Sequence, residues 1–251
     1  MRRMYQCEWH GIEFSSLAGC SSRRLADAAF YVAFYEKFFA RYRNWEDLSP
    51  TWRRGKELCA ERVLSVAGPR STVLSIGCGL GYMEYFLRAR SADTDIYLHE
   101  VAPSAWNWIR GEFAVDHLLL GEIPACLPAE ARFDVAYLCA VEYALDDEAL
   151  VHLLASLRSV LRPRGRLLMI SASFQPTAST AVEHVRAVAR GVKDVVAAAL
   201  DAAGLRSRGQ FWGWMRTREQ LRALMRSAGY RDVEDGFVEP SRRDYYWIAG
   251  S

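Results

Sequence analysis

Hydrophobic residues along the chain alternate between two spacings, one typical of strands and one typical of helices. Val73–Ile76 is a short aliphatic run without polar alternation, as in a strand buried on both faces. Similar runs follow at 95–100, 115–120, 133–138 and 166–171. Helical spacing fills the intervals, at 103–112 and most clearly at 147–161. This order of strands and helices predicts an α/β domain over residues 71–251.

The first 70 residues have a helical pattern of their own. Residues 23–43 carry a wide apolar face, and Ser49-Pro50 begins a second helix that ends before Gly68-Pro69. We therefore expect an N-terminal helical addition over residues 1–70. It either covers the sheet or forms a lid over a substrate pocket. The aromatic residues that favour a lid are Tyr31, Tyr35, Tyr42, Trp45 and Trp52.

The last 80 residues predict two more helices and two more strands. The helices are expected at 180–203 and 217–227, and the strands at 233–238 and 245–249. An aromatic stretch at 210–215 has two interpretations, either a wall of a substrate pocket or packed core.

A glycine-rich turn directly follows the first strand of the α/β domain. Gly77, Gly79 and Gly81 occupy alternate positions, and an apolar-periodic helix begins after them. Glycines let the chain turn sharply and let a ligand approach the backbone. The turn opens onto a helix N-terminus, which favours a carboxylate, a phosphate or a ribose hydroxyl. A dinucleotide fingerprint would place its third glycine at position 82, which is Tyr82 here.

The ordered motifs from 71 to 171 resemble those of the Rossmann-like (class I) S-adenosylmethionine (SAM) methyltransferases. Gly-x-Gly-x-Gly follows the first strand, and Glu100 ends the second strand about 20 residues later. Phe133-Asp134 opens the fourth strand, and Leu161-Arg162-Pro163-Arg164-Gly165 precedes the fifth. The resemblance implies a doubly wound, mostly parallel seven-stranded sheet, with one antiparallel strand in a C-terminal hairpin.

The same resemblance implies SAM as cofactor, S-adenosylhomocysteine as its product, and no metal. It places Glu100 on the ribose hydroxyls and the loop after the fourth strand on the methionine part. Glu122 is either a ligand of the adenine amino group or a solvated acid. The full set of candidate cofactor-binding residues is Ser75, Gly77, Cys78, Gly79, Gly81, Tyr82, Glu100, Val101, Glu122, Ile123 and Cys139.

One residue departs from the family pattern. The family's first strand usually carries an acid two residues before the first glycine, and Ser75 stands there. The methionine amino group would then need another acceptor. Catalysis in this family can consist largely of placement and desolvation. The candidates for a catalytic base are Glu142, Tyr143, His10 and His184.

Composition narrows the acceptor and the setting. The net charge of +2 gives no electrostatic case for nucleic acid or an anionic membrane, and no apolar run approaches the ~20 residues of a membrane span. The six scattered cysteines and the absence of an apolar N-terminal stretch lead us to expect a cytoplasmic protein. A small-molecule O or N acceptor is favoured, and the oligomeric state is left open.

Three alternatives share parts of this pattern. An aminopropyltransferase would need an acidic polyamine pocket, and a nicotinamide oxidoreductase would need the missing third glycine. A catalytically inactive SAM-binding protein is compatible with Ser75.

Overall fold

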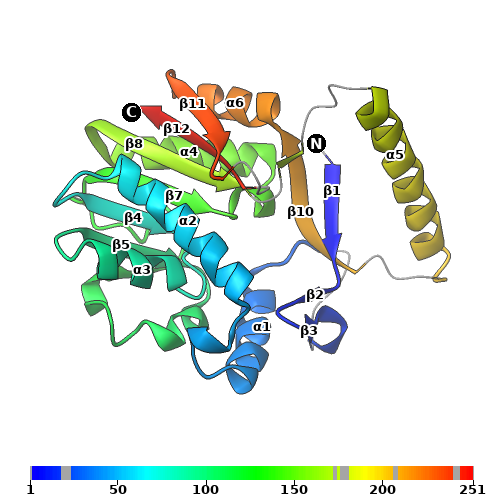
Figure 1. The fold of residues 1–251 in the computed structure, drawn as a ribbon, viewed down its shortest axis with the longest axis horizontal. Helices are drawn as coiled ribbons and strands as arrows, with labels where there is room; N and C mark the ends of the chain where they lie inside the picture. Colours follow the sequence, from blue (N-terminus) through cyan, green and yellow to red (C-terminus); the bar gives the residue numbers. More distant parts are fainter. Residues whose placement is uncertain are drawn as a thin grey trace.

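The computed structural model describes residues 2–17, 24–171, 174–175, 181–205, 209–239 and 244–250. Its main sheet has seven strands in the order β11-β12-β8-β7-β4-β5-β6 (Figure 1). The strands are β4 (Thr72–Ile76), β5 (Asp95–Glu100), β6 (Leu118–Leu120), β7 (Phe133–Cys139), β8 (Leu161–Ser171), β11 (Val233–Phe237) and β12 (Tyr245–Gly250). Only β12 runs antiparallel to its neighbours β8 and β11, so the predicted seven-stranded, mostly parallel sheet is confirmed.

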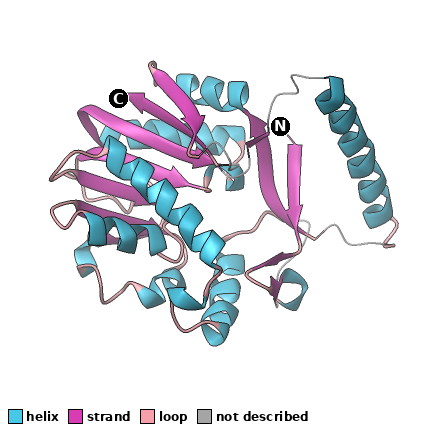
Figure 2. Ribbon diagram, in the orientation of Figure 1, coloured by secondary structure: helices cyan, strands magenta, loops and turns pink. Residues whose placement is uncertain are grey.

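Helices cover both faces of this sheet (Figure 2). They are α1 (Ala28–Arg41), α2 (Pro50–Val66), α3 (Tyr82–Arg90), α4 (Asp147–Val160) and α6 (Arg218–Ser227). Successive strand residues point to opposite faces. Accordingly, Val73 belongs to the core under α1, α2 and α3, whereas Leu74 belongs to the core under α4 and α6.

Short elements connect these helices and strands. The hairpin β2–β3 lies near the N-terminus, and short 3-10 helices join the longer elements. Their bounds are β2 (Glu8–Trp9), β3 (Ile12–Glu13), η1 (Phe14–Ser16), η2 (Trp45–Asp47), η3 (Pro103–Trp108), η4 (Val115–His117) and η5 (Glu142–Ala144). The helix expected at 103–112 is therefore wrong in type, and the strand expected from 115 begins at Leu118.

A second, three-stranded sheet was not predicted. The aromatic stretch forms β10 (Gln210–Thr217), which pairs antiparallel with β1 (Arg2–Gln6) and parallel with β9 (Phe174–Gln175). The N-terminal addition is thus part strand, and hydrogen bonds join its first residues to the C-terminal third of the chain.

The helix expected at 180–203 is present as α5 (Ala181–Ala202). It stands apart from the main sheet, on the side where β1 lies (Figure 1). Several of its valines are exposed, among them Val185, Val188 and Val195.

Candidate functional site

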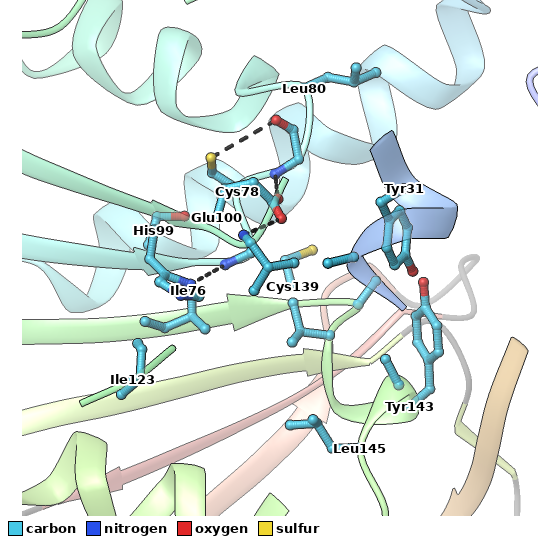
Figure 3. A pocket seen from close by; sticks show the side chains of 18 of the residues that line it. Tyr31, Ile76, Cys78, Leu80, His99, Glu100, Ile123, Cys139, Tyr143 and Leu145 are labelled. Carbon is cyan, nitrogen blue, oxygen red and sulfur yellow. Dashed lines mark hydrogen bonds between the residues drawn. The ribbon is translucent and has the colours of Figure 1, made fainter. Parts of the chain in front are cut away.

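A cavity of about 690 Å³ opens beyond the carboxyl ends of β4, β5 and β7. Open α/β sheets bind ligands at this edge. The glycine turn and the end of β5 line one part of the cavity, and aromatic residues from α1, α2 and η5 line another (Figure 3).

The glycine turn lies against the cavity at Gly77 and Gly79. Both have left-handed backbone conformations, with φ of +63° and +58°. A Cβ atom at Gly79 would meet only the Tyr35 hydroxyl, at 3.4 Å, so the space above this residue is open. Gly81 differs, because it does not line the cavity and a Cβ there would lie 2.4 Å from Cδ1 of Ile109. The requirement for glycine at position 81 therefore comes from packing and from its φ of +70°.

Glu100 ends β5 with its carboxylate fixed by backbone amides. Oε2 accepts from the Gly79 N–H at 2.9 Å, and Oε1 accepts from the N–H groups of Val101 and Ala102 at 2.7 and 3.4 Å. Burial raises the pKa of Glu100, and these three hydrogen bonds oppose that shift. The carboxylate is thus held in one orientation at the cavity wall, where its remaining lone pairs can accept from ribose hydroxyls.

His99 holds the turn from behind. The Gly77 N–H donates to its Nδ1 at 3.4 Å, and its Nε2 lies 2.7 Å from the Gly121 carbonyl. Burial lowers the pKa of His99, so a neutral ring with Nε2–H as donor fits both contacts. These two contacts give His99 a role in holding the turn. The neighbouring residues Gly121, Glu122 and Ile123 line the cavity on the side of the predicted adenine contact.

Two charged residues of the cavity were missed at the sequence level. Glu84, in the first turn of α3, accepts hydrogen bonds from Ser75 and Tyr137, and Lys56 on α2 lies 3.4 Å from Sγ of Cys139. Each sits on a helix whose hydrophobic pattern alone does not show which side faces a ligand. The absence of an acid at Ser75 was the available signal that another acid would be needed.

The aromatic part of the cavity comes mainly from the N-terminal addition. Tyr31, Tyr35 and Trp52 line it as expected, together with Trp9, whereas Tyr42 and Trp45 do not. The hydroxyl groups of Tyr31 and Tyr143 face each other (Figure 3). Burial raises the pKa of both tyrosines, so both stay protonated at neutral pH.

The aromatic stretch at 210–215 is packed core. Trp212 is buried, stacks on Phe14 at a centroid distance of 5.0 Å and lies 6.1 Å from the ring of Tyr143. None of its aromatic residues lines the cavity, so the pocket-wall interpretation is wrong.

Of the three candidate bases whose side chains the structure describes, only Tyr143 lines the cavity. His10 is packed among Trp9, Phe38 and Trp52, and burial, with the nearby charge of Lys56, lowers its pKa to about 4. The carboxylate of Glu142 is buried beside Ser171, behind the cavity wall. His184 lies in α5, and its side chain is outside the described residues.

Glu142 gives the fold a pH dependence that can be measured. Burial raises its pKa from 4.5 to about 7, so between these values the native state binds more protons than the unfolded state. Stability therefore falls as pH rises through this window, by about 3 kcal/mol in all.

Glu142→Gln should remove that loss of stability. The quantity to compare is the unfolding free energy of the variant minus that of the unmodified protein. We expect this difference to be about 3 kcal/mol more positive at about pH 8 than at about pH 4. Urea titrations of both proteins at the two pH values measure it, and an equal difference at both would contradict it.

The residues of the cavity fit the cofactor that the resemblance implies. The open space above Gly79 would be filled by any side chain, Glu100 offers oriented acceptor oxygens, and Glu84 keeps one buried oxygen without a hydrogen-bond partner. Among the described residues, no group of His, Cys, Asp or Glu is arranged to hold a metal ion. Within the same ranges, no helix is long and apolar enough to cross a bilayer.

Comparisons with known proteins agree with this geometry. A family model described as a methyltransferase domain matches residues 45–235. No curated protein matches the sequence significantly.

Several solved structures share the fold. Human N-acetylserotonin methyltransferase in complex with SAM is 14% identical with a TM-score of 0.57, and the match covers 95% of this chain and 62% of that chain. Mitomycin 7-O-methyltransferase is 19% identical with a TM-score of 0.56, and the match covers 92% of this chain and 65% of that chain. CalO1, a methyltransferase in calicheamicin biosynthesis with S-adenosylhomocysteine bound, is 20% identical with a TM-score of 0.56, and the match covers 94% of this chain and 62% of that chain. This chain therefore spans less than two thirds of the length of each of them.

Proposed function

Because the chain belongs to the methyltransferase domain family, whose model matches residues 45–235, we propose that it transfers a methyl group from SAM to an oxygen or nitrogen atom of a small molecule. The observation that carries the proposal is the composition of the cavity. One continuous space adjoins both the glycine turn with Glu100 and a wall of aromatic side chains.

Each part of the cavity has a role in this proposal. When bound, SAM supplies an electrophilic methyl group. Glu100 accepts hydrogen bonds from the ribose, and Glu122 and Ile123 lie against the adenine. The aromatic wall excludes water and orients the acceptor. The Tyr31–Tyr143 hydroxyl pair stays protonated, so it can position a polar atom of the acceptor by hydrogen bonds but does not remove its proton.

The aromatic residues favour a flat or partly apolar acceptor. Trp9, Tyr31 and Trp52 present ring surfaces to the cavity, and the net charge of +2 gives nucleic acid no electrostatic advantage. The names of similar structures, such as mitomycin 7-O-methyltransferase, support oxygen as the acceptor atom. Because these rings lie within residues 1–70, we propose that this segment covers the acceptor.

Thermal melting with candidate ligands tests the cofactor. S-adenosylhomocysteine should raise the melting temperature of the full chain, because a ligand that binds only the native state stabilises it, and NADH should not. A shift with NADH, or none with S-adenosylhomocysteine, would contradict the proposal.

Transfer of labelled methyl from SAM to a panel of small phenols and amines tests the activity, with RNA and DNA as comparison substrates. Binding of S-adenosylhomocysteine without transfer to any acceptor would favour the catalytically inactive alternative.

A further inference from the structure

The family's acid on the first strand is replaced here by a carboxylate from the next helix. Glu84 has an exposed fraction of only 1%, and its Oε1 accepts from Ser75 Oγ at 2.6 Å and from the Tyr137 hydroxyl. Its Oε2 is buried without a hydrogen-bond partner. Glu84 lines the cavity, so this oxygen is an acceptor available for a ligand. The acid is thus retained beside Ser75, although it is supplied from nine positions further along the chain.

A cation lines the same cavity without neutralising that acid. Lys56 extends from α2, with its Nζ 3.4 Å from Sγ of Cys139 and 5.9 Å from the ring centroid of Trp52. Among the ion pairs of the described residues none joins Lys56 to Glu84, although burial raises the pKa of Glu84 and the positive charge of Lys56 acts against that shift. An ammonium group whose nearest partners are a thiol and an aromatic ring retains donors for an anion.

We propose that Glu84 and Lys56 bind the α-amino acid end of the cofactor, with Glu84 accepting from its ammonium group and Lys56 donating to its carboxylate. This inference rests on the proposed function, because it takes SAM as the ligand. An α-amino acid carries both charges on neighbouring atoms, so it requires an anion and a cation that face one space and do not pair with each other. Cys139 lines the space with them, at the start of the loop that is predicted to cover the methionine part.

Lys56 thereby becomes a specificity-determining residue. A cofactor lacking its carboxylate, as in decarboxylated SAM, would leave the Lys56 ammonium without an anion and would leave the cofactor's own ammonium without the negative charge that offsets it. The pair therefore favours the methyl donor over the aminopropyl donor, which is the substrate that the aminopropyltransferase alternative would need.

Calorimetry on the full chain with two ligands tests the pair. S-adenosylhomocysteine carries the amino acid end, and 5′-methylthioadenosine lacks it while sharing the adenosine part. We expect Lys56→Met and Glu84→Gln each to weaken S-adenosylhomocysteine binding by roughly ten- to a hundredfold and to change 5′-methylthioadenosine binding less than about twofold. Lys193→Met on α5 and Glu148→Gln, in the first turn of α4, are matched controls that should leave both affinities unchanged.

The ratio of the two affinities within each variant separates a lost contact from a damaged fold. Equal weakening of both ligands, or unchanged S-adenosylhomocysteine binding in a folded variant, would overturn the pair while leaving the proposed function intact. If Glu84→Gln does not fold, Lys56→Met and Lys56→Arg decide alone, and the arginine variant should retain more affinity than the methionine variant. Failure of the unmodified protein to bind S-adenosylhomocysteine would overturn the proposed function, and this inference with it.

Discussion

Replacing Gly79 with valine is expected to lower the affinity for S-adenosylhomocysteine by at least about a hundredfold. A Cβ at this position points into open cavity, with only the Tyr35 hydroxyl near it at 3.4 Å, and the two methyl groups of valine would fill the space that a ligand needs. The backbone adds strain, because a φ of +58° disfavours a β-branched residue. Isothermal calorimetry on the folded variant measures the effect.

Gly204→Val is the matched control for that strain. Gly204 has a φ of +70° and no heavy atom within 4 Å of a Cβ built on it, and it follows α5, outside the cavity. The Gly204→Val variant should lose stability to a similar extent and keep its affinity for S-adenosylhomocysteine. Unaltered binding by Gly79→Val would remove the glycine turn from the cofactor site.

The second large effect is expected at Glu100. Glu100→Ala removes the acceptor for the ribose and also frees the Gly79 N–H that the carboxylate holds at 2.9 Å. Loss of a hydrogen bond to a charged group costs roughly 1.5–3 kcal/mol, so affinity for S-adenosylhomocysteine should fall roughly ten- to a hundredfold.

Asp95→Ala provides the comparison for Glu100→Ala. Asp95 begins the same strand at its opposite end, where its Oδ1 lies 3.3 Å from Nε2 of His117, and such contacts near the surface contribute little. The affinity of the Asp95→Ala variant for S-adenosylhomocysteine should match that of the unmodified protein. Equal affinities for Glu100→Ala and Asp95→Ala, with both variants folded, would show that Glu100 does not bind the ribose.

The elements that the sequence predicted are those whose signals are local. An aliphatic run predicted β4, helical spacing predicted α4, and the position of Glu100 at the end of a predicted strand made it a candidate ligand of the ribose. Each signal depends only on residues close together in the chain, so no knowledge of the tertiary structure was needed to interpret it.

The features that were missed depend on distant segments. Nothing in the spacing of α3 indicates that Glu84 turns back onto β4. Lys56 reaches the cavity because α2 packs against β7 and β8. The stretch 103–112 was predicted as an α-helix from its spacing, but only a six-residue 3-10 helix forms, with Trp106 and Ile109 packed into the core. Ile109 also occupies the space beside Gly81, so the packing of Ile109 requires a glycine at that position.

The pairing of β1 with β10 has a consequence for how the protein is made. A ribosome releases the N-terminus first, yet Arg2 pairs with Met215, so β1 waits unpaired while the intervening domain is synthesised. During that time Phe14 and Phe30 lack Trp212, the ring that covers them in the finished fold. Contacts so distant in sequence form slowly and leave apolar surface exposed to aggregation. The packing of Trp212 against Phe14 and Phe30 therefore forms only after β10 has been synthesised, later in the chain than the glycine turn and Glu100.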